Sequence, residues 1–234
     1  MQGGGFYRKD FLRHFVGKQT GITERAVDLQ IGRLLASKKL VRKARGEYQV
    51  NGNHLPELVC HLSESERDLY QKLKKKFPFL DFCIWSPRVL SQFMHHVPDV
   101  AYTFVDVEKD GMESVFHALQ NMALNRNILL APSAEECSRY LMGDVIVVRQ
   151  LIGQSPLTEM EGCVVPRIEK ILVDAVGDKE MDYARGSEIY QVFKEVFERV
   201  HVNVSKLMRY ASRRNRRQQI EGILKTLEHD QSSE

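Results

Sequence analysis

Residues 38–50 read KKLVRKARGEYQV, and this stretch decides the fold of the first part of the chain. Leu40–Val41 and Tyr48–Val50 are short runs with β-branched and aromatic side chains, which are typical of strands. Arg45–Gly46 lies between them, and glycine tolerates the positive φ of a tight turn. The stretch therefore predicts a β-hairpin with basic side chains near its tip.

Two helices are expected before this hairpin. The segment Tyr7–Phe15 has its apolar side chains on one side, which indicates a short amphipathic helix. After a turn at residues 17–21, Thr23 is placed to cap a second helix over about Glu24–Ser37, because its hydroxyl can accept a free backbone amide. Two helices followed by a basic hairpin predict a winged helix-turn-helix domain over residues 1–52.

The second expected helix has an apolar side and a polar side. Its apolar stripe, with spacings of three and four residues, consists of Val27, Ile31, Leu34 and Leu35. The opposite side carries basic, amide and small side chains, which suit a helix in the major groove of DNA. Because Arg pairs with guanine edges and Gln with adenine, the predicted base-reading residues are Arg25, Gln30 and Arg33.

Basic residues continue from the end of this helix into the hairpin. They are Lys38, Lys39, Arg42, Lys43 and Arg45. Side chains of this kind bind phosphates beside a groove, and Thr23 at the start of the helix completes the predicted DNA-binding set. A winged helix that is used only for protein contacts is the alternative interpretation.

Charge is distributed unevenly along the chain. The whole sequence carries 34 Lys and Arg against 31 Asp and Glu, a formal net charge of +3. Residues 1–50 have a balance of +7, residues 51–200 have a balance of −7, and residues 201–217 contain six basic side chains and no acid. A basic beginning and a basic late stretch indicate contact with a polyanion at two places.

The late basic stretch predicts a helix with one apolar and one cationic side. Its basic residues are Lys206, Arg209, Arg213, Arg214, Arg216 and Arg217, and they surround apolar residues such as Leu207 and Tyr210. A face of this kind can bind DNA, RNA or an acidic protein. A solvated face on an ordinary terminal helix explains the same pattern.

The second domain, residues 57–234, is expected to be an α/β domain with a helical C-terminal end. A polar linker with Gly and Pro precedes it at residues 51–56. The expected strands are Phe82–Trp85, Tyr102–Val107, Asn127–Leu130 and Asp144–Val148. The expected helices are Ser63–Lys76, Pro87–His95, Met112–Leu124, Ala134–Leu141, Val165–Val176, Gly186–Val200, Val204–Arg214 and Arg217–Glu228. Alternating strands and helices predict a parallel or mixed sheet.

The motif Asp106–Lys109 invites comparison with metal-dependent nucleases. On a strand Asp106 and Glu108 would share a face and Lys109 would point away, so the acid-x-Lys spacing of such enzymes is absent. The sequence also lacks a nucleophile elbow and a glycine-rich phosphate loop. We therefore expect a protein without catalytic residues, metal or cofactor. A nuclease or nucleotidyl-transfer domain that the first domain targets to DNA is the enzymatic alternative.

The cysteines and the hydropathy of the chain indicate the cellular compartment of the protein. The four cysteines are Cys60, Cys83, Cys137 and Cys163, and their scattered positions predict isolated buried thiols instead of a zinc site. No apolar run reaches the roughly 20 residues of a membrane span, and the first residues lack the apolar core of a signal peptide. These features predict a cytoplasmic protein that does not bind membranes.

Four segments resemble one known family. Leu40–Tyr48 resembles the L-(L/V)-x-R…x-G-x-Y ending of the winged-helix domain in AbiEi-type antitoxins of type IV toxin–antitoxin systems. Ile84–Leu90 and Tyr102–Lys109 are similar to the second domain of these regulators, and Val165–Asp174 is similar to their (T/S)-P-x-x-(R/K)-(T/I)-L-V-D element, in which Pro166 would open a helix. The resemblance implies an antitoxin that binds double-stranded operator DNA, represses its own operon and opposes a nucleotidyltransferase-like toxin.

Overall fold

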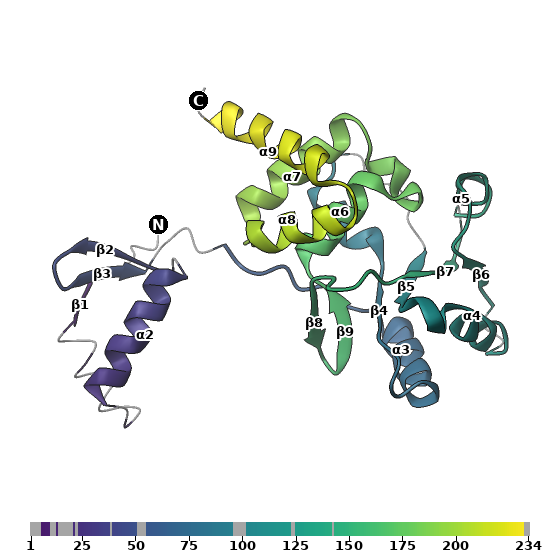
Figure 1. Ribbon diagram of the computed structural model, residues 1–234, viewed down its shortest axis with the longest axis horizontal. Helices are drawn as coiled ribbons and strands as arrows, with labels where there is room; N and C mark the ends of the chain where they lie inside the picture. The colour runs from purple at the N-terminus through teal and green to yellow at the C-terminus, as the bar shows by residue number, and fades with distance from the viewer. Residues whose placement is uncertain are drawn as a thin grey trace. The chain divides into compact units, whose positions relative to one another are not determined.

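A computed structural model describes residues 6–9, 13, 21, 23–37, 39–50, 55–95, 102–122, 125–141 and 143–231. The chain divides into two compact units, Met1–Pro56 and Glu57–Glu234, which we call the head and the body. Figure 1 labels the helices and strands of each unit. Among the described residues, no helix is long and apolar enough to cross a membrane.

The head combines a small antiparallel sheet with a helix. Helix α2 spans Glu24–Ala36, strand β2 spans Leu40–Ala44 and strand β3 spans Glu47–Val50. The predicted hairpin is thus present, and Gly46 in its turn has a φ of 77°. A third strand, β1 (Phe6–Arg8), pairs with β3, so that the strand order is β1-β3-β2.

Our prediction of a helix over Tyr7–Phe15 is wrong for its first two residues. Tyr7 and Arg8 lie in β1, where they pair with Tyr48 and Glu47 of β3. Lys9 and Arg13 are helical, and the other residues of the expected helix lie outside the described residues. A short apolar pattern fits a strand as well as a helix, and here the pairing with β3 decides between them.

The body contains a four-stranded mixed sheet, as the sequence predicts. Its order is β4-β5-β7-β6, with β4 (Phe82–Trp85) antiparallel to β5 (Thr103–Val107). Strands β7 (Val145–Gln150) and β6 (Asn127–Leu130) run parallel to β5. Every residue of β4 and β5 is buried, which is the pattern of a sheet covered on both faces.

Helices cover the two faces of this sheet. Helices α3 (Glu64–Lys76) and α4 (Met112–Gln120) lie on one face, where their apolar side chains pack against Val105 and Val107 of β5. Helices α6 (Ile168–Gly177), α7 (Ser187–Arg199) and α8 (Val204–Arg213) lie on the other face (Figure 1). The side chains of β5 alternate between the two layers, so Phe104 and Asp106 point toward the α6 side.

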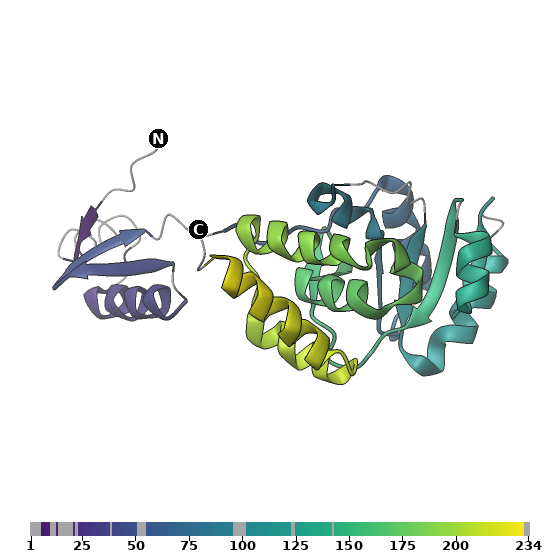
Figure 2. The same cartoon turned by 90° about the horizontal axis from the view of Figure 1, so that it is seen from above.

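The C-terminal end of the body is helical, as expected. Helix α9 (Arg217–Gln231) packs beside α8, as Figure 2 shows. The remaining helical segments are η1 (Pro87–Phe93), η2 (Lys109–Gly111), α5 (Ala134–Tyr140) and η3 (Lys179–Ala184). Segment η1 is a 3-10 helix. A capping box is present at the start of α3, because Ser63 and Glu66 each bond to the other's backbone amide.

The prediction of a helix that starts at Val165 is wrong by three residues. Val165 and Pro166 end strand β9 (Cys163–Pro166), which forms a hairpin with β8 (Leu157–Met160). Helix α6 begins at Ile168, after Arg167 in an extended conformation. Proline lacks the amide of a central strand but is tolerated at the end of one, so Pro166 closes the strand and does not open the helix.

Candidate nucleic-acid interface

The apolar side of α2 packs on the hairpin of the head. Val27 and Ile31 are buried together with Leu40 and Tyr48, and Leu34 and Leu35 are partly buried against them. The predicted stripe is confirmed. Packing on this side fixes which side of α2 is left for solvent and for a partner.

The cap of α2 is also as expected. Thr23 has an extended backbone, and its hydroxyl accepts a hydrogen bond from the backbone amide of Ala26 at 3.3 Å. Thr23 is exposed, so this hydroxyl lies at the surface beside the N-terminus of the helix. The free amides of a helix N-terminus favour an anion at this end.

The opposite side of α2 and the hairpin present cationic side chains to solvent. The exposed residues of the predicted DNA-binding set are Thr23, Arg25, Gln30, Arg33, Lys39, Arg42 and Arg45. Among the described residues, no acid lies within salt-bridge distance of these five cations. Lys38 lies outside the described residues, and so does the side chain of Lys43. The five exposed cations are therefore available to a polyanion.

The acidic residue in the middle of α2 is bound inside the head. Asp28 accepts hydrogen bonds from Arg13, whose Nε lies 2.9 Å from Oδ1, and its other oxygen lies 3.1 Å from Nζ of Lys9. The hydrogen bond from Arg13 lowers the pKa of Asp28 to about 2. The ion pairs hold Lys9 and Arg13 against α2 and neutralise the carboxylate of Asp28.

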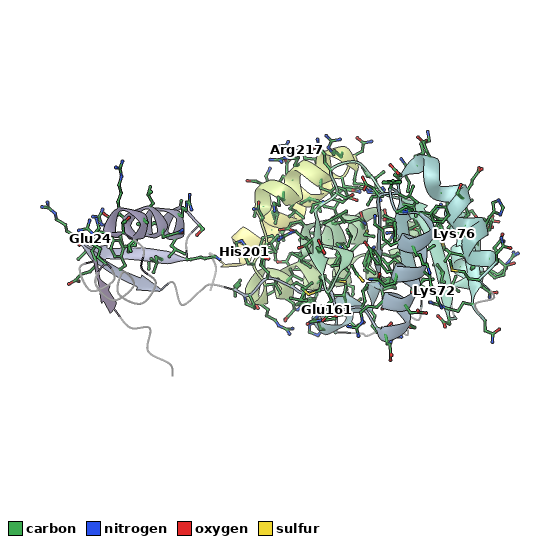
Figure 3. The ribbon with its side chains drawn as sticks, turned by 90° about the horizontal axis from the view of Figure 1, so that it is seen from below. Glu24, Lys72, Lys76, Glu161, His201 and Arg217 are labelled. Atoms are coloured by element: carbon green, nitrogen blue, oxygen red, sulfur yellow. The ribbon has the colours of Figure 1, made fainter. Side chains whose placement is uncertain are left out.

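The predicted basic face near the C-terminus separates into two groups. Lys206, Arg209, Arg213 and Arg217 are exposed, and Figure 3 shows Arg217 at the surface of α9. Arg214 and Arg216 are only partly exposed and contact the interior. Arg214 pairs with Asp178, and Arg216 Nη2 donates to the carbonyl oxygen of Gly177 at 3.0 Å. Four of the six residues thus form a surface, and two belong to the interior of the body.

The structure does not bring the three residues of the nuclease comparison together. Asp106 is buried, whereas Glu108 and Lys109 are exposed beyond the end of β5. Asp106 accepts hydrogen bonds from Arg149, Lys170 and Trp85, with the Lys170 nitrogen at 2.6 Å. Burial alone would raise the pKa of Asp106, but the two cations hold it well below its usual range. Among the described residues, no group of three His, Cys, Asp or Glu is placed to hold a metal ion.

Most residues of the two candidate surfaces lie within the match to one family; Thr23 and Arg25 precede it. Residues 26–230 match a family of unknown function, DUF6577. The chain belongs to DUF6577. The match begins within α2 and ends within α9, so DUF6577 includes the hairpin of the head and almost all of the body. No curated protein matches the chain.

The part of the chain shared with DUF6577 contains a buried charge network that sequence reasoning missed. Asp174 on α6 accepts hydrogen bonds from Lys170 at 2.6 Å and Tyr210 at 3.0 Å. Arg149 reaches both Asp106 and Asp178. Burial, followed by the nearby Asp174 carboxylate, raises the pKa of Asp178 to about 6.

A sequence signal for this network existed. Lys170 and Asp174 are spaced by four residues in α6, in which residues 168–175 are all buried. Asp106 and Arg149 similarly interrupt two strands whose other residues are apolar except for Thr103 and Gln150. Charged residues inside such runs are rarely buried unless they are paired, so these four side chains could have been predicted to pair.

Proposed function

We propose that this member of DUF6577 is a DNA-binding transcriptional regulator whose head is a winged helix-turn-helix domain. In this assignment α2 is the recognition helix, and the β2–β3 hairpin is the wing. The strand order β1-β3-β2 and the position of α2 directly before the hairpin support the assignment. The ion pairs from Arg13 and Lys9 to Asp28 support it further, since they join residues that precede the recognition helix to that helix.

The observation that carries the proposal is the exposed cationic side of the head. Exposed cations without an acidic partner attract phosphates at long range and release counterions when they bind them. Arg25, Gln30 and Arg33 would contact base edges. The phosphate contacts would come from Thr23, Lys38, Lys39, Arg42, Lys43 and Arg45.

The body would serve binding and not catalysis. The buried side chains of Arg149, Lys170 and Asp174 form ion pairs within the interior, and Asp106 has cations at both of its oxygens. Together with the resemblance to AbiEi-type antitoxins, this arrangement supports a cytoplasmic antitoxin that represses its own operon. Its second partner would be a nucleotidyltransferase-like toxin, bound by the body.

The test is a salt titration of DNA binding by the full chain. Fluorescence anisotropy would compare the protein's own upstream DNA with a scrambled duplex. We expect specific binding that weakens roughly 10²–10³-fold between about 50 and 200 mM salt, as for about five phosphate contacts. Absence of binding at low salt would refute the proposal.

Charge-reversal variants separate the head from general electrostatics. The variant Arg42→Glu/Lys43→Glu should lose specific binding, because two phosphate contacts become repulsive. The matched control is Lys75→Glu/Lys76→Glu, which reverses two adjacent exposed cations on α3 of the body. Equal losses in both variants would indicate non-specific attraction, and unchanged binding in the head variant would favour a head that contacts only protein.

A further inference from the structure

A cavity of about 400 Å³ lies at the carboxyl ends of the parallel strands of the body. Ala131, directly after β6, and Gln150, at the end of β7, both line it. After β5 the chain enters α4 on one face of the sheet, whereas after β7 it leads to α6 on the other face. In open α/β sheets, ligands bind in the crevice that such a divergence opens.

Charged side chains dominate the wall of this cavity. Its cations are Arg149, Lys170, Lys179, Arg214 and Arg216. Its acids are Asp174, Asp178 and Glu180, and Asp106 lies behind them in contact with Arg149 and Lys170. Five cations thus face four acids, so the cavity and its immediate surroundings have an excess of positive charge.

The excess positive charge is located on particular groups. The acids pair with Arg149, Lys170 and Arg214, whereas Lys179 and Arg216 have no acid within salt-bridge distance among the described residues. The Nε of Arg214 is buried and forms no hydrogen bond, although Oδ1 of Asp174 lies 3.5 Å from it. Arg216 uses Nη2 on the carbonyl of Gly177, which leaves its other nitrogens for a ligand. Buried donors without acceptors are costly unless a ligand or water supplies one.

Gly177 is the residue that lets Arg216 lie against the cavity. A Cβ at position 177 would stand 1.9 Å from Nε of Arg216, which no two such atoms can tolerate. The α6 helix ends at Gly177, and its φ does not require glycine. The absence of a side chain at this position therefore serves the placement of the Arg216 guanidinium.

We propose that this cavity binds a small phosphate-bearing anion of about the size of a nucleoside monophosphate. Two guanidinium groups and one ammonium can each meet a different oxygen of a phosphate, and guanidinium forks fit phosphate oxygens in pairs. The volume exceeds that of a phosphate ion and lies within the roughly 300–1,000 Å³ of small-molecule sites. The site lies within the body and does not depend on the DNA-binding proposal.

Isothermal titration calorimetry of the full chain tests the site. The probes are adenosine monophosphate, inorganic phosphate and adenosine, each in a buffer without phosphate. We expect adenosine monophosphate to bind with one-to-one stoichiometry, phosphate to bind more weakly at the same site, and adenosine to give no heat. Absence of heat with both phosphate-bearing probes, or equal binding of adenosine, would overturn the proposal.

Variants at neighbouring positions locate the binding. Arg216→Gln should weaken binding of adenosine monophosphate by about tenfold or more, because it removes a charged donor. Arg217→Gln is the matched control, since Arg217 pairs with Glu221 at the surface, and it should bind as wild type does. A wild-type affinity in a folded Arg216→Gln protein would overturn the assignment.

A second variant moves Arg216 without a change of charge. Gly177→Ala should push the guanidinium out of the cavity and weaken binding similarly, while circular dichroism confirms the fold. The head variant Arg42→Glu/Lys43→Glu should leave binding of adenosine monophosphate unchanged. If it abolished this binding, the anion would bind to the head, and the cavity would not be the site.

Discussion

Arg33 of the head and Arg149 of the body are cations in opposite environments. Arg33 on α2 is exposed, and no described acid lies within salt-bridge distance of it. Arg149 on β7 is buried, and four acids lie within 4.0 Å of its nitrogens: Asp106, Asp174, Asp178 and Glu180. The comparison separates two uses of charge, because an exposed cation is free for a partner whereas a buried one is committed to the fold.

The difference is also energetic. Removing an exposed charge changes folding stability little, since even exposed ion pairs contribute only about 0–1 kcal/mol. Removing one partner of a buried pair leaves a charge without compensation and costs about 3–5 kcal/mol. Substitutions of exposed cations in the head should therefore weaken DNA binding and leave folding stability unchanged. Substitutions in the buried network should lower folding stability.

The largest effect is expected for Asp106→Ala in the body. Its loss removes the nearest acid of Arg149 and one of the two acids at 2.6 Å from Lys170, so the free energy of unfolding should fall by about 3–5 kcal/mol. The control is Asp68→Ala, which breaks an exposed pair with Lys72 and should cost at most about 1 kcal/mol. Urea denaturation followed by circular dichroism measures both, and equal stability of the two variants would contradict this account of the network.

The next effect concerns base recognition by the head. Arg33→Ala should weaken binding to the protein's own operator by about 1–3 kcal/mol and relax selectivity at one base pair. Its urea denaturation should match that of wild type, because Arg33 is exposed. Anisotropy with single-base-pair variants of the operator measures selectivity. A loss of affinity that is uniform over all sequences would show that Arg33 contacts phosphate and not a base.

A smaller effect is expected for a cation on the wing. Arg42→Ala should weaken binding to operator and scrambled DNA alike, and it should reduce the slope of log affinity against log salt by about 1. The control is Arg139→Ala, an exposed cation on α5 of the body, which should leave the slope unchanged. If Arg42→Ala kept the wild-type slope, the hairpin would not contact DNA as a wing.

The elements of the fold that the sequence predicted best have strong local signals. Strands β4 and β6 are found at their predicted bounds, because each contains a short apolar run that begins directly after a polar or charged residue. The turn at Gly46 depends on a single residue whose conformational freedom is local. The β8–β9 hairpin was missed, although Glu161–Gly162 forms its turn and both residues have positive φ.

The sequence could indicate that the buried charges of the body are paired, but not which of them contact one another. Arg149 and Lys170 bind Asp106 across 43 and 64 positions of the chain. Such contacts follow from the strand order and from the helix that covers the sheet, neither of which the spacing of residues determines. For the same reason the sequence analysis places Arg214 and Arg216 on the basic surface, because the sequence shows their charge but not where their side chains point.

The smallest effect concerns Asp28, whose charge is paired with two cations of the head. Its pKa is lowered to about 2 by Arg13, so its pairing stabilises the head above the ordinary pKa of 3.8, and this contribution is lost as the pH falls through about 2. Asp28→Asn should therefore lower the melting temperature of the head slightly and by a constant amount between about pH 5 and 8, with the difference from wild type shrinking below about pH 4. Because the variant frees Lys9 and Arg13, it should also bind DNA slightly more tightly at low salt, and added salt should remove this gain. Melting curves that diverge between pH 5 and 8 would contradict the lowered pKa, and weaker DNA binding would show that these ion pairs position α2 instead of only neutralising its carboxylate.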